Sequence, residues 1–261
     1  MQFVDVCIGD RIATVSFSRG DGLNALSLQL MEELRDTARR LADNTDITAV
    51  VLTGNGVFTA GADLNDPRQV EIANMSRVEQ RHHLKLGPDM CDAWQAIEAY
   101  TVAAIEGFCI GGGSALASAL DYRIMAEDAH MRLPEIALGM NMSWHTLPRL
   151  VAQIGPALTK RYVILCEKIP AAQAQTWGLC EEVVPNGETL EHALAYAAKV
   201  AAMPPLAVRM SKQAVNQATY ALANATTFMD RDQFMLATHS DDYKEAIAAY
   251  LQKRDPEFTG N

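Results

Sequence analysis

The chain has 261 residues, 49% hydrophobic and 21% charged, which is enough to bury the core of one large domain and gives no sign of disorder. A formal net charge of −10 argues against a nucleic-acid duplex or an anionic membrane surface as the main partner. The five cysteines are scattered without a Cys-x-x-Cys pair, and the start of the chain has no secretory signal, so we expect a cytoplasmic protein with reduced thiols and no metal site.

The N-terminal part of the chain predicts a hairpin, a helix and a buried strand. Gly9-Asp10 separates two apolar runs, which is typical of a β-hairpin, and Ser27 is a favourable helix N-cap. The expected elements are strands at Phe3–Ile8 and Ile12–Ser18, a helix from Ser27 to about Leu41, and a strand at Ala49–Thr53.

The middle of the chain repeats this rhythm after a polar segment. Residues 65–97 are rich in charge and histidine and are expected to form a helical excursion. A strand at Val102–Ile105, a helix from about Gly113 and a strand at Tyr122–Ala126 follow. Apolar strands that alternate with helices indicate a parallel sheet buried on both faces. The most apolar window, Tyr100–Leu120, contains Glu106 and four glycines and does not predict a membrane span.

The last third of the chain is expected to be helical. Met203-Pro204-Pro205 interrupts the pattern and is the candidate boundary between residues 1–203 and residues 204–261. Helices are expected near Pro156–Leu165, Ala171–Gly178 and Leu190–Ala202, and again from about 206 to 254.

Three short motifs carry the chemistry. Ala60-Gly61-Ala62-Asp63 and Gly111-Gly112-Gly113 can each present a backbone N–H from a turn, and two such donors aimed at one point stabilise an oxyanion. Pro134-Glu135 adds a carboxylate. An oxyanion hole with one glutamate suggests enolate chemistry beside a thioester carbonyl.

These motifs, taken with several others in the same order, resemble the crotonase (enoyl-CoA hydratase/isomerase) superfamily over nearly the whole chain. The further matching pieces are Leu23-Asn24-Ala25-Leu26, Val51-Leu52-Thr53-Gly54, Ala104-Ile105-Glu106-Gly107, Gly155-Pro156, Ala171-Ala172-Gln173-Ala174, Gly178-Leu179 and Lys253-Arg254. The resemblance implies an α/β fold with a crotonase-like spiral of ββα turns and a helical C-terminal trimerisation region. It also implies an acyl-CoA substrate, no cofactor beyond the coenzyme A of that substrate, and a homotrimer or a dimer of trimers.

The resemblance also assigns roles to particular residues. The backbone N–H groups of Ala62 and Gly112 are the implied oxyanion donors, with the helix end at Gly112 adding to the stabilisation, and Glu135 is the implied catalytic base. The implied CoA-binding residues are Arg19, Ala25, Ala60, Asp63, Leu64 and Lys253, the last reaching a neighbouring subunit's CoA phosphates.

One departure from the family decides the expected reaction. Hydratases of the family carry two glutamates, and the position of the first is Ala115 here. Losing one acid–base group typically lowers a rate by about 10²–10⁴-fold. A double-bond shift needs only one base, so the sequence favours Δ3,Δ2-enoyl-CoA isomerisation by Glu135. Slow hydration, thioester or C–C bond cleavage, and a non-catalytic CoA-binding scaffold remain open as alternatives.

The loop after Glu135 is the second departure. Typical hydratases have a glycine-rich loop there, whereas Met140, Trp144 and His145 fill it in this chain and are expected to line the acyl pocket. His145 could also substitute for the missing acid or base. The family's dienoyl-CoA isomerases place a second acid in this loop. This chain has Ser143 at that position, which weakens its interpretation as a dienoyl-CoA isomerase.

Overall fold

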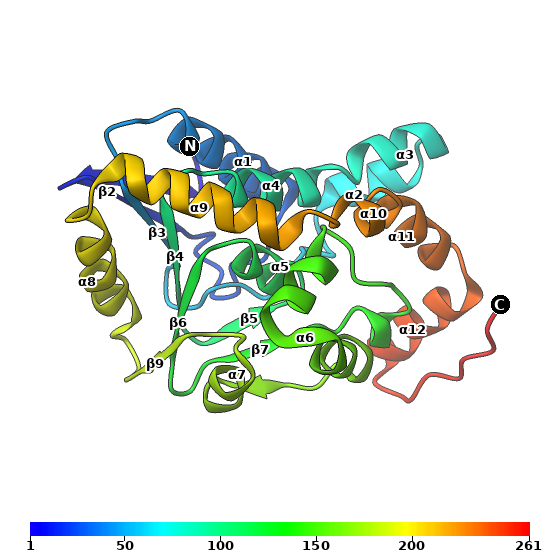
Figure 1. The fold of residues 1–261 in the computed structure, drawn as a ribbon. Helices are drawn as coiled ribbons and strands as arrows, with labels where there is room; N and C mark the ends of the chain where they lie inside the picture. The colour runs from blue at the N-terminus through cyan, green and yellow to red at the C-terminus, as the bar shows by residue number, and fades with distance from the viewer.

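A six-stranded sheet forms the centre of the computed structural model, which describes residues 1–261 (Figure 1). Its strand order is β1-β2-β3-β4-β6-β9, and only the pair of β1 with β2 is antiparallel. The strands are Val4–Gly9 (β1), Ile12–Phe17 (β2), Ala49–Gly54 (β3), Tyr100–Ile105 (β4), Tyr122–Ala126 (β6) and Glu182–Val184 (β9). The parallel sheet predicted from the apolar strands is therefore confirmed.

Both faces of this sheet are buried, because successive side chains of its central strands enter different cores. Val50 and Leu52 of β3 join the main core, which helices α1 (Leu28–Ala42) and α4 (Leu86–Gln95) cover. Val51 joins a smaller core beneath α8 (Thr189–Ala201). Alternation with period 2 explains why β3 carries no exposed residue.

A second, three-stranded sheet gives the chain its spiral form. It consists of β5 (Phe108–Ile110), β7 (His130–Arg132) and β8 (Ile169–Pro170), in the order β5-β7-β8. β4 leads into β5 and β6 leads into β7, while a bridge between Thr59 and Cys109 places the chain after β3 beside them. Each turn thus contributes one segment to each layer, which is the ββα repeat expected from the resemblance.

The glycine turn and the loop with Glu135 both follow strands of this second sheet. Helix α5 (Gly112–Ser118) begins after β5, and a 3-10 turn, η1 (Ile136–Leu138), follows β7. Because β5 and β7 are parallel neighbours, their carboxyl ends lie at the same edge. The fold therefore brings the two motifs together.

Further helices surround the two sheets. The predicted helical excursion is confirmed as α2 (Pro67–Ala73), α3 (Arg77–His83) and α4. Helices α6 (Thr146–Leu165) and α7 (Ala171–Trp177) follow η1.

Two predicted elements differ from the structure. The hairpin turn is at Asp10-Arg11, one residue beyond the predicted place; both residues have positive φ, as a two-residue type I′ turn requires. The helix predicted from Pro156 is only the second piece of α6. The first piece begins at Thr146, and the two meet at Gly155, whose φ of 72° and ψ of 168° are not helical.

The C-terminal helices pack on the rest of the chain. The break at Met203-Pro204-Pro205 falls between α8 and α9, and α9 (Pro205–Tyr220) then crosses the molecule toward α4 and α6 (Figure 1). The last helices are α10 (Asn224–Thr227), α11 (Asp230–Thr238) and α12 (Asp241–Gln252). Helix α11 contacts α3, and α12 contacts η1 directly after Glu135. Whether residues 204–261 are a separate domain stays a prediction.

Cys7 on β1 is exposed, whereas the other four thiols are buried and free. No helix has both the length and the apolar character needed to cross a bilayer.

Candidate active site

The N–H group of Ala62 is unpaired because its neighbours use the available acceptors. Leu26 N–H donates to the Gly61 carbonyl at 2.7 Å, and Asp63 N–H donates to the Leu26 carbonyl at 3.1 Å. These two hydrogen bonds form a parallel bridge between Leu26 and Ala62. In such a bridge the N–H of Ala62 points away from the partner segment, and it donates to no acceptor in the chain.

The second unpaired N–H belongs to Gly112, the first residue of α5. The first N–H groups of a helix have no acceptor within the helix, and that of Gly112 finds none elsewhere in the chain. Gly61 lies directly against this segment, since a Cβ on Gly61 would be 2.6 Å from the Ile110 carbonyl oxygen and 3.5 Å from Gly112 N. The two free donors thus come from adjacent turns and can serve one oxyanion.

Glu135 adds a carboxylate to these turns. Gly111 has φ 53° and ψ −119°, and a Cβ there would lie only 2.8 Å from Glu135 Oε1. Glu135 Oε2 is buried without a hydrogen-bond partner. Burial raises the pKa of Glu135 from 4.5 to about 7, so this group can accept and release a proton near neutral pH.

The indole of Trp144 fills the space beside Gly112. A Cβ on Gly112 would lie 2.3 Å from Trp144 Cζ3, and one on Gly87 of α4 would lie 2.2 Å from Trp144 Cε2. Only glycine at both positions lets the ring lie between α4 and α5. The structure therefore brings Trp144 together with Gly112, and its place in the acyl pocket stays a prediction.

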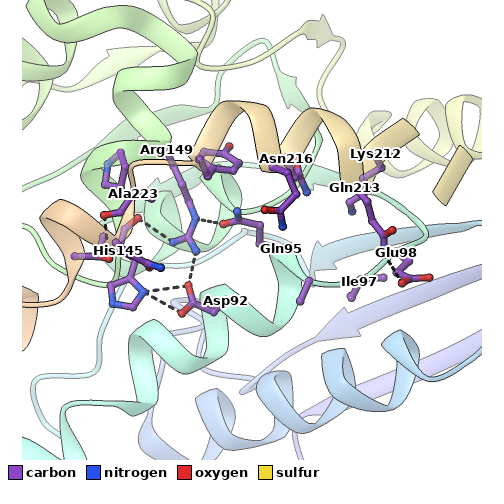
Figure 2. Close-up of a pocket in the computed structure, with 16 residues that line it drawn as sticks. Asp92, Gln95, Ile97, Glu98, His145, Arg149, Lys212, Gln213, Asn216 and Ala223 are labelled. Carbon is purple, nitrogen blue, oxygen red and sulfur yellow. Dashed lines mark hydrogen bonds and ion pairs between the residues drawn. The ribbon is translucent and has the colours of Figure 1, made fainter. Parts of the chain in front are cut away.

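His145 is directed to a different group of side chains. Its Nδ1 lies 2.9 Å from Asp92 Oδ2 (Figure 2). Its backbone N–H donates to Asp230 Oδ2 at 2.8 Å. With Arg149 it lines a cavity of about 670 Å³ between α4, α6, α9 and α10, whose lining includes neither Glu135 nor Gly112. The structure gives the imidazole a contact with Asp92 and none with Glu135. Sequence reasoning placed His145 in the acyl pocket.

Trp144 and His145 are both in the left-handed region, with φ 61° and 56°. Such a backbone is disfavoured by about 1–2 kcal/mol for each residue other than glycine. Arg149 holds this backbone, because its Nη1 donates to the Trp144 carbonyl at 2.9 Å and to the His145 carbonyl at 3.1 Å. Arg149 is 3% exposed, and its other donors reach Asp92 and Gln95 of α4.

Sequence reasoning missed Asp92, Arg149 and Asp230. Asp92 and Asp230 are 53 and 85 residues from His145 along the chain, so no local pattern connects them. Arg149 stands four residues after His145, the spacing of one helical turn, but that signal is visible only once α6 is known to begin at Thr146. Burial raises the pKa of Asp230, although its hydrogen bond from the His145 N–H opposes the shift.

Arg19 joins the two loops that the resemblance assigns to CoA binding. Its Nη1 donates to Asp63 Oδ2 at 2.5 Å and to the Ala25 carbonyl at 3.1 Å. Asp21 Oδ2 lies 3.5 Å from its Nε. Two carboxylates thus already face the guanidinium, and a phosphate would compete with them for it.

The other predicted residues lie at different depths. Ala60 N–H donates to the Leu23 carbonyl, and the side chain of Leu64 is 56% exposed. Met140 is buried, and its N–H donates to the Glu135 carbonyl at 2.9 Å. Lys253 is exposed at the end of α12, with its backbone in the left-handed region.

Ala115 is fully buried on α5, one turn after Gly111 and Gly112. No group of three or more His, Cys, Asp or Glu side chains is placed to hold a metal ion. The site therefore consists of two backbone donors, one carboxylate and an aromatic wall.

The sequence matches the family model described as enoyl-CoA hydratase/isomerase over residues 8–261. The chain is 34% identical over 254 residues to the 2,3-dehydroadipyl-CoA hydratase of Escherichia coli (strain K12), with 96% of each chain covered. It is 30% identical to the crotonyl-CoA hydratase of Syntrophomonas wolfei, with 95% of each covered. Its structure is similar to an enoyl-CoA hydratase/isomerase from Pseudoalteromonas atlantica T6c, with a TM-score of 0.87, 26% identity, and 98% and 99% of the two chains covered.

Proposed function

The chain belongs to the enoyl-CoA hydratase/isomerase family, and from this premise we propose that it moves the double bond of an enoyl-CoA between the 3,4 and 2,3 positions. One observation carries the proposal: a single carboxylate, Glu135, lies beside the turn that presents the free Gly112 N–H, and its pKa is raised to about 7. A base with this proton affinity can take a proton and later return it.

The steps use only residues of this site. The thioester oxygen accepts hydrogen bonds from the N–H groups of Ala62 and Gly112. Glu135 removes a proton from C2, and the electron pair moves into the thioester to give a dienolate. The two N–H groups stabilise its negative oxygen. Glu135 then returns the proton at C4, which leaves the double bond at the 2,3 position and the carboxylate regenerated.

Hydration is the second candidate, because relatives of the chain are named as hydratases. Addition of water across the double bond needs a group that activates the water and one that manages the proton reaching Cα. Ala115 removes the first glutamate of the family pattern, and His145 is hydrogen-bonded to Asp92. Two features of the chain therefore favour isomerisation over hydration.

Proton NMR in D₂O with 2-enoyl-CoA and 3-enoyl-CoA substrates tests the proposal. We expect the two enoyl forms to interconvert, with exchange at C2 and C4 and little 3-hydroxyacyl product. A 3-hydroxyacyl-CoA as the main product would replace the proposal by hydration. Turnover of both substrates that survives unchanged in Glu135→Gln would contradict the assigned base.

Substrate binding and assembly complete the proposal. Arg19, Ala25, Ala60, Asp63 and Leu64 are proposed to contact the CoA moiety of the substrate, and no other cofactor is needed. Exposed apolar side chains of the C-terminal region are proposed to form a homotrimer or a dimer of trimers, in which Lys253 reaches the CoA of a neighbouring subunit; they include Leu206, Leu222, Phe228 and Leu236. We also propose that the protein works in the cytoplasm.

A further inference from the structure

The strained backbone at Trp144 and His145 is held from three sides. Arg149 donates to both carbonyls from α6, and Asp92 of α4 accepts from Arg149 Nη2 at 2.7 Å and contacts the His145 imidazole (Figure 2). Asp230, the first residue of α11, accepts the His145 N–H at 2.8 Å. Residues held in a disfavoured conformation persist only where the surroundings determine them fully.

These contacts hold the backbone, and the backbone in turn sets the position of the Trp144 indole. Trp144 lies between Gly87 and Gly112 at distances that admit no Cβ on either glycine. The direction of its Cα–Cβ bond is fixed by the left-handed backbone. If the backbone relaxed to an ordinary conformation, the ring would leave Gly112, where the thioester of an acyl-CoA is bound in the proposed function.

We propose that Asp92, Arg149 and Asp230 form a clamp that positions Trp144 and thereby sets the length of the acyl group that the site accepts. The clamp residues do not touch the substrate and act through the Trp144–His145 backbone. Asp230 belongs to the C-terminal region, so that region contributes to substrate choice in the same chain. The inference rests on the proposed acyl-CoA site.

The alternative is that the clamp only caps α6. Arg149 and Asp230 are 3% and 5% exposed, and buried hydrogen-bonded groups of this kind often stabilise a fold without affecting specificity. The two roles make different predictions, because a cap changes thermal stability alone, whereas a positioning residue also changes acyl selectivity.

The test measures binding of two saturated thioesters, butyryl-CoA and octanoyl-CoA, by titration calorimetry, which requires no turnover. Removing the indole in Trp144→Ala is expected to raise the octanoyl-to-butyryl affinity ratio by about tenfold or more, because it opens space for added methylenes. Opening the clamp in Asp230→Ala is expected to shift the ratio in the same direction by about three- to tenfold. In the Trp144→Ala background, Asp230→Ala should add no further shift.

Matched variants separate positioning from general damage. Asp230→Asn keeps an oxygen that accepts the His145 N–H, so it should retain the wild-type ratio. Asp232→Ala removes an exposed carboxylate of the same helix, which pairs with Arg81, and should leave the ratio unchanged. Asp92→Ala opens the clamp at a side chain that is 47% exposed, and it replaces Asp230→Ala if that variant does not fold.

Three results would overturn the inference. If Trp144→Ala leaves the ratio unchanged, the indole is not the wall that sets chain length. If Asp230→Ala and Asp92→Ala change only the melting temperature, or if their shifts of the affinity ratio add in full to that of Trp144→Ala, the clamp does not act through the indole. If the wild-type chain binds neither thioester, the acyl-CoA site of the proposed function fails, and this inference fails with it.

Discussion

Glu135 holds a carboxyl group where its charge has no protein partner. Its Oε2 is buried without a hydrogen bond, and its Oε1 faces the glycine turn. An unpaired buried carboxylate is destabilising when ionised, which is why its pKa is raised to about 7. The same property that weakens the fold gives the site a base of useful strength.

The stability of the chain should therefore fall as Glu135 ionises. The folded state keeps this proton to about pH 7, whereas the unfolded chain releases it near 4.5. Folded molecules bind more protons in that window, so the free energy of unfolding decreases as pH rises through it, by at most about 3 kcal/mol from this group. Glu135→Gln should leave stability nearly unchanged at pH 4.5 and raise it at pH 8, as urea unfolding would measure. Equal effects at both pH values would contradict the assignment.

Activity should follow the opposite trend. Because the base must be ionised to accept a proton, kcat/KM should rise with pH and level off above about 7. Glu135→Gln should lower kcat/KM by about 10²–10⁴-fold without loss of folding. A pH–rate profile of both proteins tests this. A wild-type profile that is flat between pH 5 and 8 would disprove the role of this carboxyl.

The residues of the site were predictable to different degrees. Glycine motifs at tight turns predicted Ala62 and Gly112, and Pro134-Glu135 predicted the carboxylate. The structure places these motifs close together, and the roles of the three residues stay predictions. The partner of His145 was not predictable. Asp92 meets it only through the packing of α4 against α6, and a loop histidine gives no sign of which carboxylate will hold it.

At the scale of elements, α5 and the loop before α6 exclude each other's larger side chains. Gly112 and Ala115 stand three residues apart on α5, so they share one helix face. Trp144 already occupies that face at Gly112. The small residues of α5 are therefore complementary to the large Trp144 of the loop. The effect of replacing one of them depends on which residue stands at the other position.

Restoring the missing glutamate should accordingly fail by itself. Ala115→Glu places a carboxylate in a fully buried position, and we expect a loss of about 2 kcal/mol or more of stability with no gain of hydratase activity. Adding Trp144→Gly should relieve the contact and raise hydration by about 10²-fold or more over Ala115→Glu alone. Hydration of crotonyl-CoA at equal enzyme concentration measures both. A full gain in the single variant would show that Trp144 is no obstacle.

The long apolar strands were predicted well, and the short ones were not. β3, β4 and β6 have five or six residues, most of them apolar, which is enough for the pattern to stand out. β5, β7 and β9 have three residues each, too few to show any period. The first piece of α6 was not predicted, because Gly155-Pro156 indicates the start of a helix. Pro156 does begin a helical piece, but it is the second piece of α6.

Helix α9 is attached to the sheet by one buried ion pair. Lys212 Nζ lies 2.6 Å from Asp121 Oδ2 and donates to the Ala99 carbonyl at 3.0 Å. Lys212→Met leaves this carboxylate without its cation, so we expect about 3 kcal/mol of destabilisation in urea unfolding. Lys199→Met, at an exposed lysine of α8, is the control and should change stability by less than about 0.5 kcal/mol. Equal values for the two variants would show that the pair contributes nothing.

For the whole molecule, exposed apolar side chains gather on the C-terminal helices. Leu222, Phe228 and Leu236 are 81%, 67% and 78% exposed, and they lie on or between α9 and α11. Single exposed apolar residues are ordinary, but several on one short region indicate a surface that a further chain covers. This supports the proposed trimer.

Light scattering after gel filtration should give three or six times the mass of one chain. Replacing Phe228 and Leu236 together by Asp should reduce this mass, because charges in an apolar interface oppose association. Val78→Asp on α3, at a residue that is 80% exposed outside this region, should leave the mass unchanged. A monomeric wild-type chain at micromolar concentration would contradict the proposed assembly.

The distribution of thiols has a practical consequence for following this assembly. Burial raises the pKa of Cys91, Cys109 and Cys180 to about 12, and Cys166 is also buried, so these thiols stay protonated and out of reach of reagents. Cys7 stands exposed on the edge strand β1. A maleimide dye should therefore attach once per chain without any cysteine having to be removed. Energy transfer between such dyes would report, in the unmutated protein, how many chains come together and when they separate.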